Sequence, residues 1–188
     1  MNSGEHAAYQ EPGILRRFFN LLAWAGFVAL LSWLTFAYVG HAYAVPTGSM
    51  EKTIMTGDRV LAEKVSYYLR DPEPGDIVMF EDPEIPGRLL LKRCIAVGGQ
   101  TVDINDEDGL VYVDGVALRE PYTDGLPTYT LASDVSYPYT VPEGMMWMMG
   151  DNRTNSQDSR YFGAVSVASA EARSVAVLWP LGDVGLLG

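Results

Sequence analysis

The chain has 188 residues, which leaves room for one modest domain and a membrane segment. Its net charge is −11 at pH 7. The charged residues before residue 41 cancel one another (Glu5, Glu11, Arg16 and Arg17), so the whole negative charge falls on residues 41–188. An acidic domain of this kind repels nucleic acid, and we expect no nucleic-acid partner.

Cysteine and histidine are scarce in this sequence. Cys94 is the single cysteine, which excludes an intrachain disulfide and a cysteine metal cluster. The two histidines, His6 and His41, lie in the N-terminal tail and just beyond the first apolar run, and neither has a partner at metal-ligand spacing. We expect no metal, no cofactor and no histidine-based triad, and we expect Cys94 to be a buried core thiol.

Residues 18–39 form one uncharged apolar run of 22 residues, FFNLLAWAGFVALLSWLTFAYV. A helix of this length spans the hydrocarbon core of a bilayer, which is about 30 Å thick. Arg16 and Arg17 stand just before the run, and the next basic residue is Lys52. The positive-inside rule therefore predicts a single-pass protein of the cell membrane. Its tail, residues 1–17, would be cytoplasmic, and its domain, residues 40–188, extracytoplasmic.

The run is followed by Ala-Tyr-Ala at residues 42–44, which fits the pattern of a signal-peptide cleavage site. The apolar run is longer than the 7–15 residues usual in a signal peptide, which favours a retained anchor. Cleavage by the protein itself at this site stays open as a second hypothesis.

After the anchor, short apolar runs alternate with Gly, Pro, Asn and Asp, a pattern typical of an all-β domain. Asp114-Gly115 between two strand-like runs predicts a two-residue hairpin. Residues 119–142 are rich in Pro, Tyr, Thr and Ser and predict a loop-rich insertion. The strands that we expect are 59–65, 76–81, 89–97, 100–104, 110–113, 116–118, 145–149 and 174–179. We expect the apolar stretches at 145–149 and 177–181 to pack mostly in the core, with lipid contact as the alternative.

Three segments carry candidate chemistry. Ser49 follows a glycine in the turn VPTGSM, just beyond the membrane run, and alone it would be read as an ordinary loop hydroxyl. Lys92 lies within an apolar strand. Burial there would lower the pKa of its amine, and a neutral amine can take the proton of a serine hydroxyl. An exposed lysine is the ordinary alternative.

The third segment, residues 150–163, reads GDNRTNSQDSRYFG and is a dense polar turn. Asp158 with Arg160, or Asp151 with Arg153, could pair to brace the loop. Ser156 is a candidate to hydrogen-bond the lysine amine and fix its direction.

These three segments, in this order behind an N-terminal anchor, resemble the bacterial type I signal peptidases. Residues 47–50 resemble the nucleophile box of that family, and Lys92, Arg93 and Gly99 resemble its lysine box. Residues 150–163 match the last box in full, and residues 111–122 resemble the family's hairpin followed by Glu-Pro-Tyr. The resemblance implies a mostly β catalytic domain and a membrane-bound serine endopeptidase that removes signal peptides after small residues. It implies preprotein signal peptides and the lipid bilayer as partners, and we expect a monomer.

The resemblance also implies a role for each matching residue. Ser49 is the nucleophile and Lys92 the general base. The Ser49 N–H and the Thr47 hydroxyl form the oxyanion hole, and Ser156 orients Lys92. Asp158 and Arg160 form a supporting ion pair. Asp151 and Arg153 are structural.

The sequence departs from the family pattern at three positions. Thr47 stands in place of a commoner serine, Lys52 replaces the proline of x-P-T-L, and Gln100 stands where aspartate is frequent. None of these changes removes a catalytic group, but the loss of proline puts the local turn in doubt.

Three alternatives remain. A self-cleaving repressor shares the Ser–Lys chemistry but is cytoplasmic, which residues 18–39 oppose. A non-enzymatic membrane-tethered scaffold would typically have lost the serine or the lysine. A peptidase specialised for pilin precursors would fit the change at Lys52.

Overall fold

The chain divides into two compact units, residues 1–37 and 38–188, in the computed structural model, which describes residues 13–38 and 40–187. The first unit contains the helix α1 (Ile14–Tyr38). Its stretch Ile14–Thr35 is long and apolar enough to cross a membrane, which is consistent with membrane anchoring. The helix begins four residues before the predicted run and includes Arg16 and Arg17. The expected limits of the tail and of the membrane segment stay predictions.

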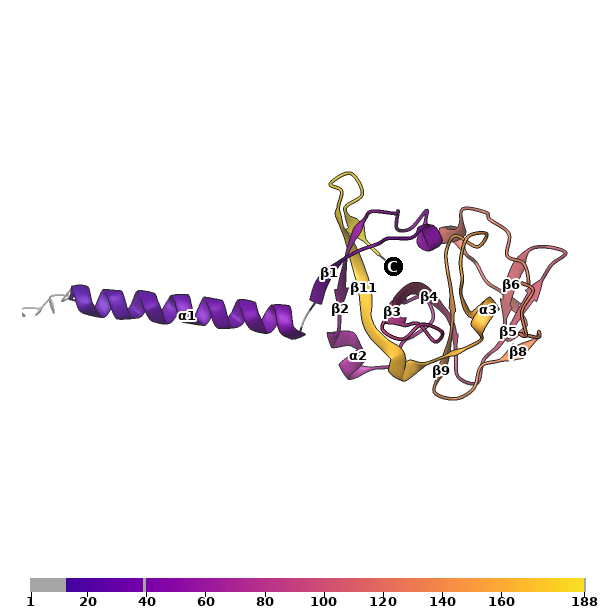
Figure 1. The fold of residues 1–188 in the computed structure, drawn as a ribbon, viewed down its shortest axis with the longest axis horizontal. Helices are drawn as coiled ribbons and strands as arrows, with labels where there is room; N and C mark the ends of the chain where they lie inside the picture. Colours follow the sequence, from indigo (N-terminus) through magenta and orange to yellow (C-terminus); the bar gives the residue numbers. More distant parts are fainter. Residues whose placement is uncertain (1–12, 39, 188) are drawn as a thin grey trace, which may run out of the picture. The chain divides into compact units, whose positions relative to one another are not determined.

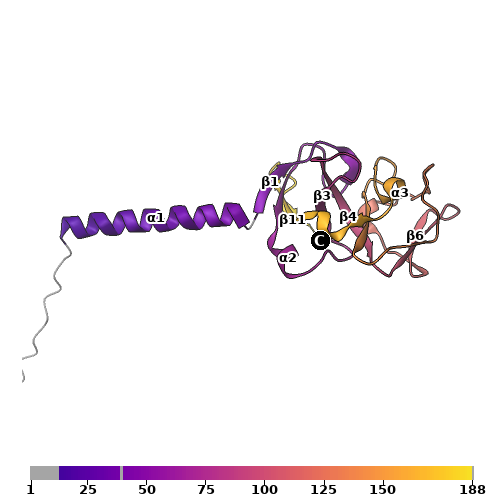
Figure 2. The same ribbon diagram turned by 60° about the horizontal axis from the view of Figure 1, so that its bottom comes forward.

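The second unit is mostly β, as the sequence predicts, and its strands form two antiparallel sheets (Figures 1 and 2). The large sheet has the strand order β1-β2-β11-β3-β4-β9-β10, and β12 pairs with β11. Its strands are β1 (Gly40–Ala44), β2 (Arg59–Glu63), β3 (Ile77–Glu81), β4 (Leu89–Val97), β9 (Met145–Met149), β10 (Val165–Ser166), β11 (Ala170–Trp179) and β12 (Gly185–Leu186).

The small sheet has the strand order β7-β6-β5-β8. Its strands are β5 (Thr101–Asn105), β6 (Leu110–Val113), β7 (Val116–Ala117) and β8 (Tyr139–Thr140). Asp114 and Gly115 connect β6 to β7 with φ angles of 52° and 77°. Two consecutive positive φ values define the predicted hairpin turn. The short helices of the unit are α2 (Val65–Leu69), α3 (Ser159–Phe162), η1 (Gly48–Met50), η2 (Pro121–Thr123) and η3 (Val167–Ser169).

Strand β9 lies between two hydrophobic cores because successive side chains of a strand point to opposite faces. Trp147 and Met149 pack in the core that β9 and β4 share with the small sheet. Met146 and Met148 pack on the other face, against Phe80 and Cys94. Core packing is therefore confirmed for this apolar stretch. Cys94 is buried, and its burial raises the pKa of the thiol to about 12.

The apolar stretch at the end of β11 is exposed, contrary to the expectation of core packing for residues 177–181. Trp179 and Leu181 are 53% and 76% exposed, and Leu186 on the paired strand β12 is 91% exposed. Within residues 177–181, only Val177 joins a hydrophobic core. The predicted insertion at residues 119–142 is loop-rich and contains η2 and the short strand β8.

Candidate active site

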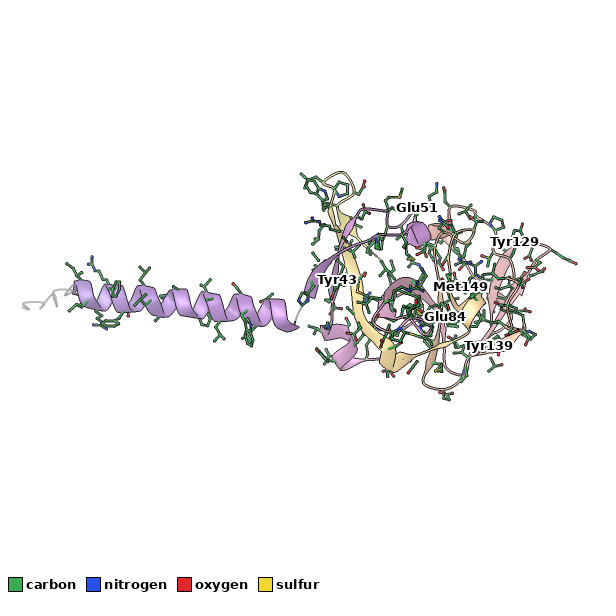
Figure 3. The ribbon with its side chains drawn as sticks, viewed as in Figure 1. Tyr43, Glu51, Glu84, Tyr129, Tyr139 and Met149 are labelled. Carbon is green, nitrogen blue, oxygen red and sulfur yellow. The ribbon has the colours of Figure 1, made fainter. Side chains whose placement is uncertain are left out.

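Ser49 lies on η1, the turn that follows β1, and two buried side chains fix this turn. Met50 and Ile54 are fully buried beneath it, in a core that also contains Val60 from β2. The backbone N–H of Ile54 donates to the carbonyl oxygen of Met50 at 2.8 Å. Glu51, labelled in Figure 3, stands on the same turn. Ser49 itself is 8% exposed, so the buried side chains of Met50 and Ile54 hold a nearly buried hydroxyl in place.

Lys92 lies in the middle of β4 opposite Val78 of β3, and it is 3% exposed. Its Nζ lies 2.5 Å from Ser49 Oγ, although 43 positions of the sequence separate the two residues. The structure thus brings together the two side chains that the sequence proposes as nucleophile and base.

The pKa of Lys92 falls from 10.5 to about 8, chiefly because burial removes water from the ammonium form. The nearby charges act in both directions. Asp158 and Asp151 raise this pKa, and Arg160 and Arg88 lower it. A tenth or so of such amines is uncharged at pH 7, which is enough to supply a base.

Asp158 and Arg160 form the predicted ion pair at 2.9 Å, with both side chains buried. Asp158 also caps α3, because its carboxylate accepts from the backbone N–H of Arg160. The same carboxylate accepts from the backbone N–H of Gly150 at 3.0 Å, and Arg160 donates to the carbonyl oxygen of Arg153 at 2.8 Å. The pair therefore fixes the path of residues 150–160 beneath the site.

Asp151 and Arg153 do not pair with each other, contrary to one reading of the sequence. Asp151 accepts two hydrogen bonds of 2.9 Å from Arg93, the residue after Lys92. Arg153 pairs instead with Glu120, on the loop that follows β7. Both arginines lie near the ring of Tyr122, with Arg93 only 4.0 Å from its centroid. Asp151 and Arg153 are therefore structural residues, because each links its loop to a distant segment of the chain.

Ser156 does not make the expected hydrogen bond to Lys92. Its hydroxyl is buried and has no hydrogen-bond partner among the described residues. The hydroxyl lies against the backbone of Gly150 instead. A Cβ built on Gly150 would lie 2.3 Å from Ser156 Oγ and 2.5 Å from the carbonyl oxygen of Ser49. The orienting role of Ser156 therefore stays a prediction without a contact to support it.

Gly150 and Asn152 are site residues to which the sequence assigned no role. Gly150 allows the polar segment to approach Ser49 closely, since any side chain there would collide. Asn152 donates its backbone N–H to the carbonyl oxygen of Ser49 at 3.1 Å and its side-chain amide to that of Gly48 at 3.0 Å. Both residues lie inside the matching box at 150–163, so the motif marked them, but their contacts depend on the fold.

Thr47 is exposed immediately before η1, and its side chain makes no capping hydrogen bond. Thr47 also lines a groove of about 440 Å³ that includes Ser49 and Lys92. Its lining residues are 43–50 and 88–92, together with Met79, Asn155 and Gln157. Figure 3 labels Tyr43 of β1, one of the lining residues.

The groove runs along an unpaired strand edge. Residues 89–92 of β4 pair with β3 on one side, whereas β9 pairs only with residues 93–97 on the other. The backbone of residues 89–92 therefore has one side that can accept another strand. Within residues 13–38 and 40–187, no group of three or more His, Cys, Asp or Glu side chains could hold a metal ion.

Known proteins resemble this chain over most of its length. The family model described as signal peptidase, peptidase S26, matches residues 18–179. The probable signal peptidase I-1 of Synechocystis is 37% identical over 158 residues, covering 80% of this chain and 77% of that protein. Signal peptidase I of Mycobacterium tuberculosis is 34% identical over 205 residues, covering 80% of this chain and 69% of that protein.

A solved structure is also similar. It is the crystal structure of a signal peptidase I from Enterococcus faecalis, which is 35% identical in sequence. The match has a TM-score of 0.48 and covers 58% of this chain and 98% of that chain.

A mostly β unit that follows an apolar helix is consistent with a membrane-anchored protein, and a nearly buried serine beside a buried lysine is typical of a serine hydrolase. The sequence matches then give the family. The chain belongs to the signal peptidases of family S26 and is a hydrolase of the signal peptidase I type.

Proposed function

We propose that this protein removes signal peptides from preproteins through a dyad of Ser49 and Lys92 and cuts after small residues. The observation that carries the proposal is the 2.5 Å separation of Lys92 Nζ and Ser49 Oγ, with the amine buried and its pKa near 8. No histidine lies in the same unit except His41, on the exposed edge strand β1.

The acylation step follows from this geometry. The neutral amine of Lys92 accepts the proton of Ser49 while Oγ attacks the carbonyl carbon of the scissile bond. The negative charge that develops on the carbonyl oxygen is stabilised by the Ser49 N–H and the Thr47 hydroxyl. The Lys92 ammonium then gives its proton to the departing amine, the C–N bond breaks, and an ester on Ser49 remains.

Deacylation uses the same base in a second cycle. Lys92, neutral again, takes a proton from a water molecule as that water attacks the ester carbonyl. The C–O bond to Ser49 breaks, and Oγ recovers a proton from Lys92. The free dyad and the carboxylic acid of the released signal peptide result. This acid then loses its proton to solvent and becomes a carboxylate, so that atoms and charge balance over the two steps.

The substrate binds as an extended strand in the groove beside Ser49. The open edge of residues 89–92 offers backbone hydrogen bonds, which is how many peptides add to an exposed sheet edge. The lining is mostly apolar and includes Ala44, Val45, Leu91 and Met79. Small apolar side chains before the scissile bond would fit such walls, which supports cleavage at A-x-A-like sites.

We infer that α1 spans the cell membrane with residues 1–17 in the cytoplasm and the β unit outside. The support is Arg16 and Arg17 at its start, together with the positive-inside rule. Exposed Trp179, Leu181 and Leu186 at the end of β11 and on β12 are candidates for lipid contact. Signal peptides of preproteins and the lipid bilayer are the partners in this proposal, and the protein acts as a monomer.

The anchor is retained in this proposal. Residues 42–44 lie in β1, and Ala44 pairs with Arg59 of β2. Ala44 stands five residues before Ser49, and we expect its pairing in β1 to keep its carbonyl away from Oγ of the same chain. Processing after Ala44 would need a second molecule and a detached strand. Intact-mass measurement of the purified protein tests this directly, with the full chain as the expected result.

The test of the dyad is cleavage of a preprotein in detergent. Ser49→Ala and Lys92→Ala should each abolish cleavage while the circular dichroism spectrum stays unchanged. Lys92→Arg should also fail, because a guanidinium stays protonated. Lys64→Arg is the matched control, since Lys64 lies in a partly exposed ion pair with Glu171. Near-normal cleavage by Lys92→Arg would contradict the proposal.

A further inference from the structure

Arg88 lines the substrate groove at the far end from the reacting groups. It stands immediately before β4 and four residues before Lys92, which corresponds to about 13 Å along a strand. Its side chain is 41% exposed. The residues between it and Lys92 are Leu89, Leu90 and Leu91, all of which also line the groove. Arg88 is therefore a charged group at one end of a mostly apolar groove.

The guanidinium of Arg88 is held in place by a buried carboxylate. Arg88 Nε and Nη2 both contact Oδ2 of Asp82, whose side chain is 1% exposed. The other oxygen of Asp82 accepts from the backbone N–H groups of Glu84 and Ile85 at 2.7 and 3.1 Å. The Asp82 N–H donates to the carbonyl oxygen of Arg88 at 2.8 Å, which closes the loop. Among the described residues, Arg88 Nη1 has no acceptor and can serve a ligand.

A substrate strand reaches Arg88 at a definite position. The apolar part of the groove takes the small side chains that precede the scissile bond, so the signal-peptide side of the substrate runs along residues 89–91. One substrate residue faces each residue of the edge, because paired strands have the same rise. The residue opposite Arg88 is then the fourth or fifth before the scissile bond.

We propose that Arg88 selects substrates by the side chain four or five residues before the scissile bond, favouring Asp, Glu or a neutral acceptor over Lys or Arg. The inference rests on the proposed function, since it assumes that signal peptides occupy the groove. Arg88 would act by hydrogen bonding through Nη1 and by repelling a substrate cation, so it is a specificity residue and not part of the dyad.

Three carboxylates near Arg88 would favour the opposite preference if they faced the substrate. Asp82 is buried and already bonded to Arg88. Glu81 accepts the backbone N–H of Gly87, and Glu84, labelled in Figure 3, accepts the side-chain amide of Gln157 at 2.7 Å. None of the three lines the groove, whereas Arg88 does. The charged side chain that lines this end of the groove is therefore the positive one of Arg88.

The test uses one signal-peptide substrate with Glu, Gln or Lys at each of the fourth and fifth positions before the bond. At one of the two positions, the wild-type protein in detergent should cleave the Glu peptide with a kcat/KM about three- to fivefold higher than that of the Lys peptide. This is the range expected of an exposed charge pair. The ratio should shrink at high salt. Each ratio compares two peptides on the same enzyme. A change in the protonation of Lys92 therefore affects both rates equally and cancels in the ratio.

Two variants assign the preference to Arg88. Arg88→Gln should bring the Glu-to-Lys ratio close to one. If that variant unfolds because Asp82 loses its partner, the double variant Asp82→Asn with Arg88→Gln removes both charges. Arg119→Gln, an exposed arginine on the loop after β7, is the control and should keep the wild-type ratio.

The outcomes separate this inference from the proposed function. Equal cleavage of all peptides by the wild-type protein, or faster cleavage of the Lys peptides, would overturn the role of Arg88. A preference that survives in both variants would overturn it as well. Failure of the wild-type protein to cleave even the unsubstituted peptide would instead contradict the proposed function.

Discussion

Arg93 donates two hydrogen bonds of 2.9 Å to the carboxylate of Asp151, across 58 positions of the sequence. Arg93 follows Lys92, the proposed base, on β4. The same carboxylate accepts a hydrogen bond from Thr53, four residues after Ser49, the proposed nucleophile. One buried aspartate therefore links the two segments that carry Ser49 and Lys92, which the sequence places far apart.

Asp151→Asn should destabilise the protein strongly because it leaves the Arg93 guanidinium buried without a counter-charge. We expect a loss of about 3–5 kcal/mol in the free energy of unfolding, measured by denaturant titration in detergent. Asp124→Asn is the matched control, since Asp124 pairs with Lys52 on the surface and both partners are more than half exposed. That control should cost less than about 1 kcal/mol. Equal effects of the two substitutions would contradict this view of Asp151.

Lys52 occupies a turn position that its side chain disfavours. Glu51 has φ −53° and ψ 145°, Lys52 has φ 86°, and the Thr53 N–H donates to the carbonyl oxygen of Met50 at 3.1 Å. These values define a type II turn, in which glycine is preferred at the position of Lys52. Proline, with φ fixed near −65°, cannot occupy this position, so the turn differs from one that carries the family's proline.

Lys52→Gly should raise the free energy of unfolding by about 1 kcal/mol, because glycine adopts positive φ without strain. Lys52→Ala is the control. It keeps the strained Cβ and loses only the exposed pair with Asp124, so its effect should stay within about 0.5 kcal/mol. Lys52→Pro should lower both stability and cleavage. A Lys52→Pro variant with wild-type rates would show that the turn is not needed to place Ser49.

The Thr47 hydroxyl should contribute to the oxyanion hole. Thr47→Val keeps the shape of the side chain and removes the donor, so we expect kcat to fall by about 10²–10³ with little change in KM. Thr47→Ser keeps the hydroxyl and should retain most of the wild-type rate. Steady-state kinetics on a signal-peptide substrate measure both. Unchanged turnover of Thr47→Val would remove Thr47 from the site.

Burial of Lys92 should make the protein less stable at neutral pH. The folded-state pKa, about 8, lies below the ordinary value of 10.5, so protonation opposes folding below pH 8. The free energy of unfolding should therefore rise as the pH increases from about 8 to 10.5. Lys92→Met removes this penalty and should be more stable than wild type by about 2 kcal/mol at pH 7, after loss of the bond to Ser49.

The stability gap between Lys92→Met and the wild type should close towards pH 10.5, as measured by urea titration across this pH range. Lys64→Met, at a surface ion pair, is the control for the loss of any lysine. A gap that is absent at pH 7, or that grows with pH, would mean that Lys92 does not carry the expected penalty.

The sequence predicts most of the strands because their apolar runs are bounded by turn residues. The runs at 89–97, 110–113 and 145–149 have the predicted limits. Strand β1 was missed because GHAYA has no strand periodicity of its own and is ordered by pairing with β2. Strand β11 begins four residues early, at AEAR, because β3 provides a partner for these residues.

The proximity of Ser49 and Lys92 was predictable from residue types and motif spacing, whereas the contacts around them were not. Asp151 and Arg153 are near neighbours in the sequence, which suggested a pair, but their partners Arg93 and Glu120 come from other strands and loops. Ser156 was expected beside Lys92, yet it packs on Gly150. Such contacts depend on the path of the loop in three dimensions, which no local pattern encodes.

The pH dependence of kcat/KM on a defined signal-peptide substrate tests the central claim most directly. If the neutral amine of Lys92 is the base, the rate should rise with pH along a limb governed by one group with an apparent pKa near 8. A variant that lacks Arg88, whose charge lowers this pKa, should move the limb to higher pH. A rate that stays constant from about pH 6 to about pH 10, roughly two units on either side of that pKa, would contradict the account.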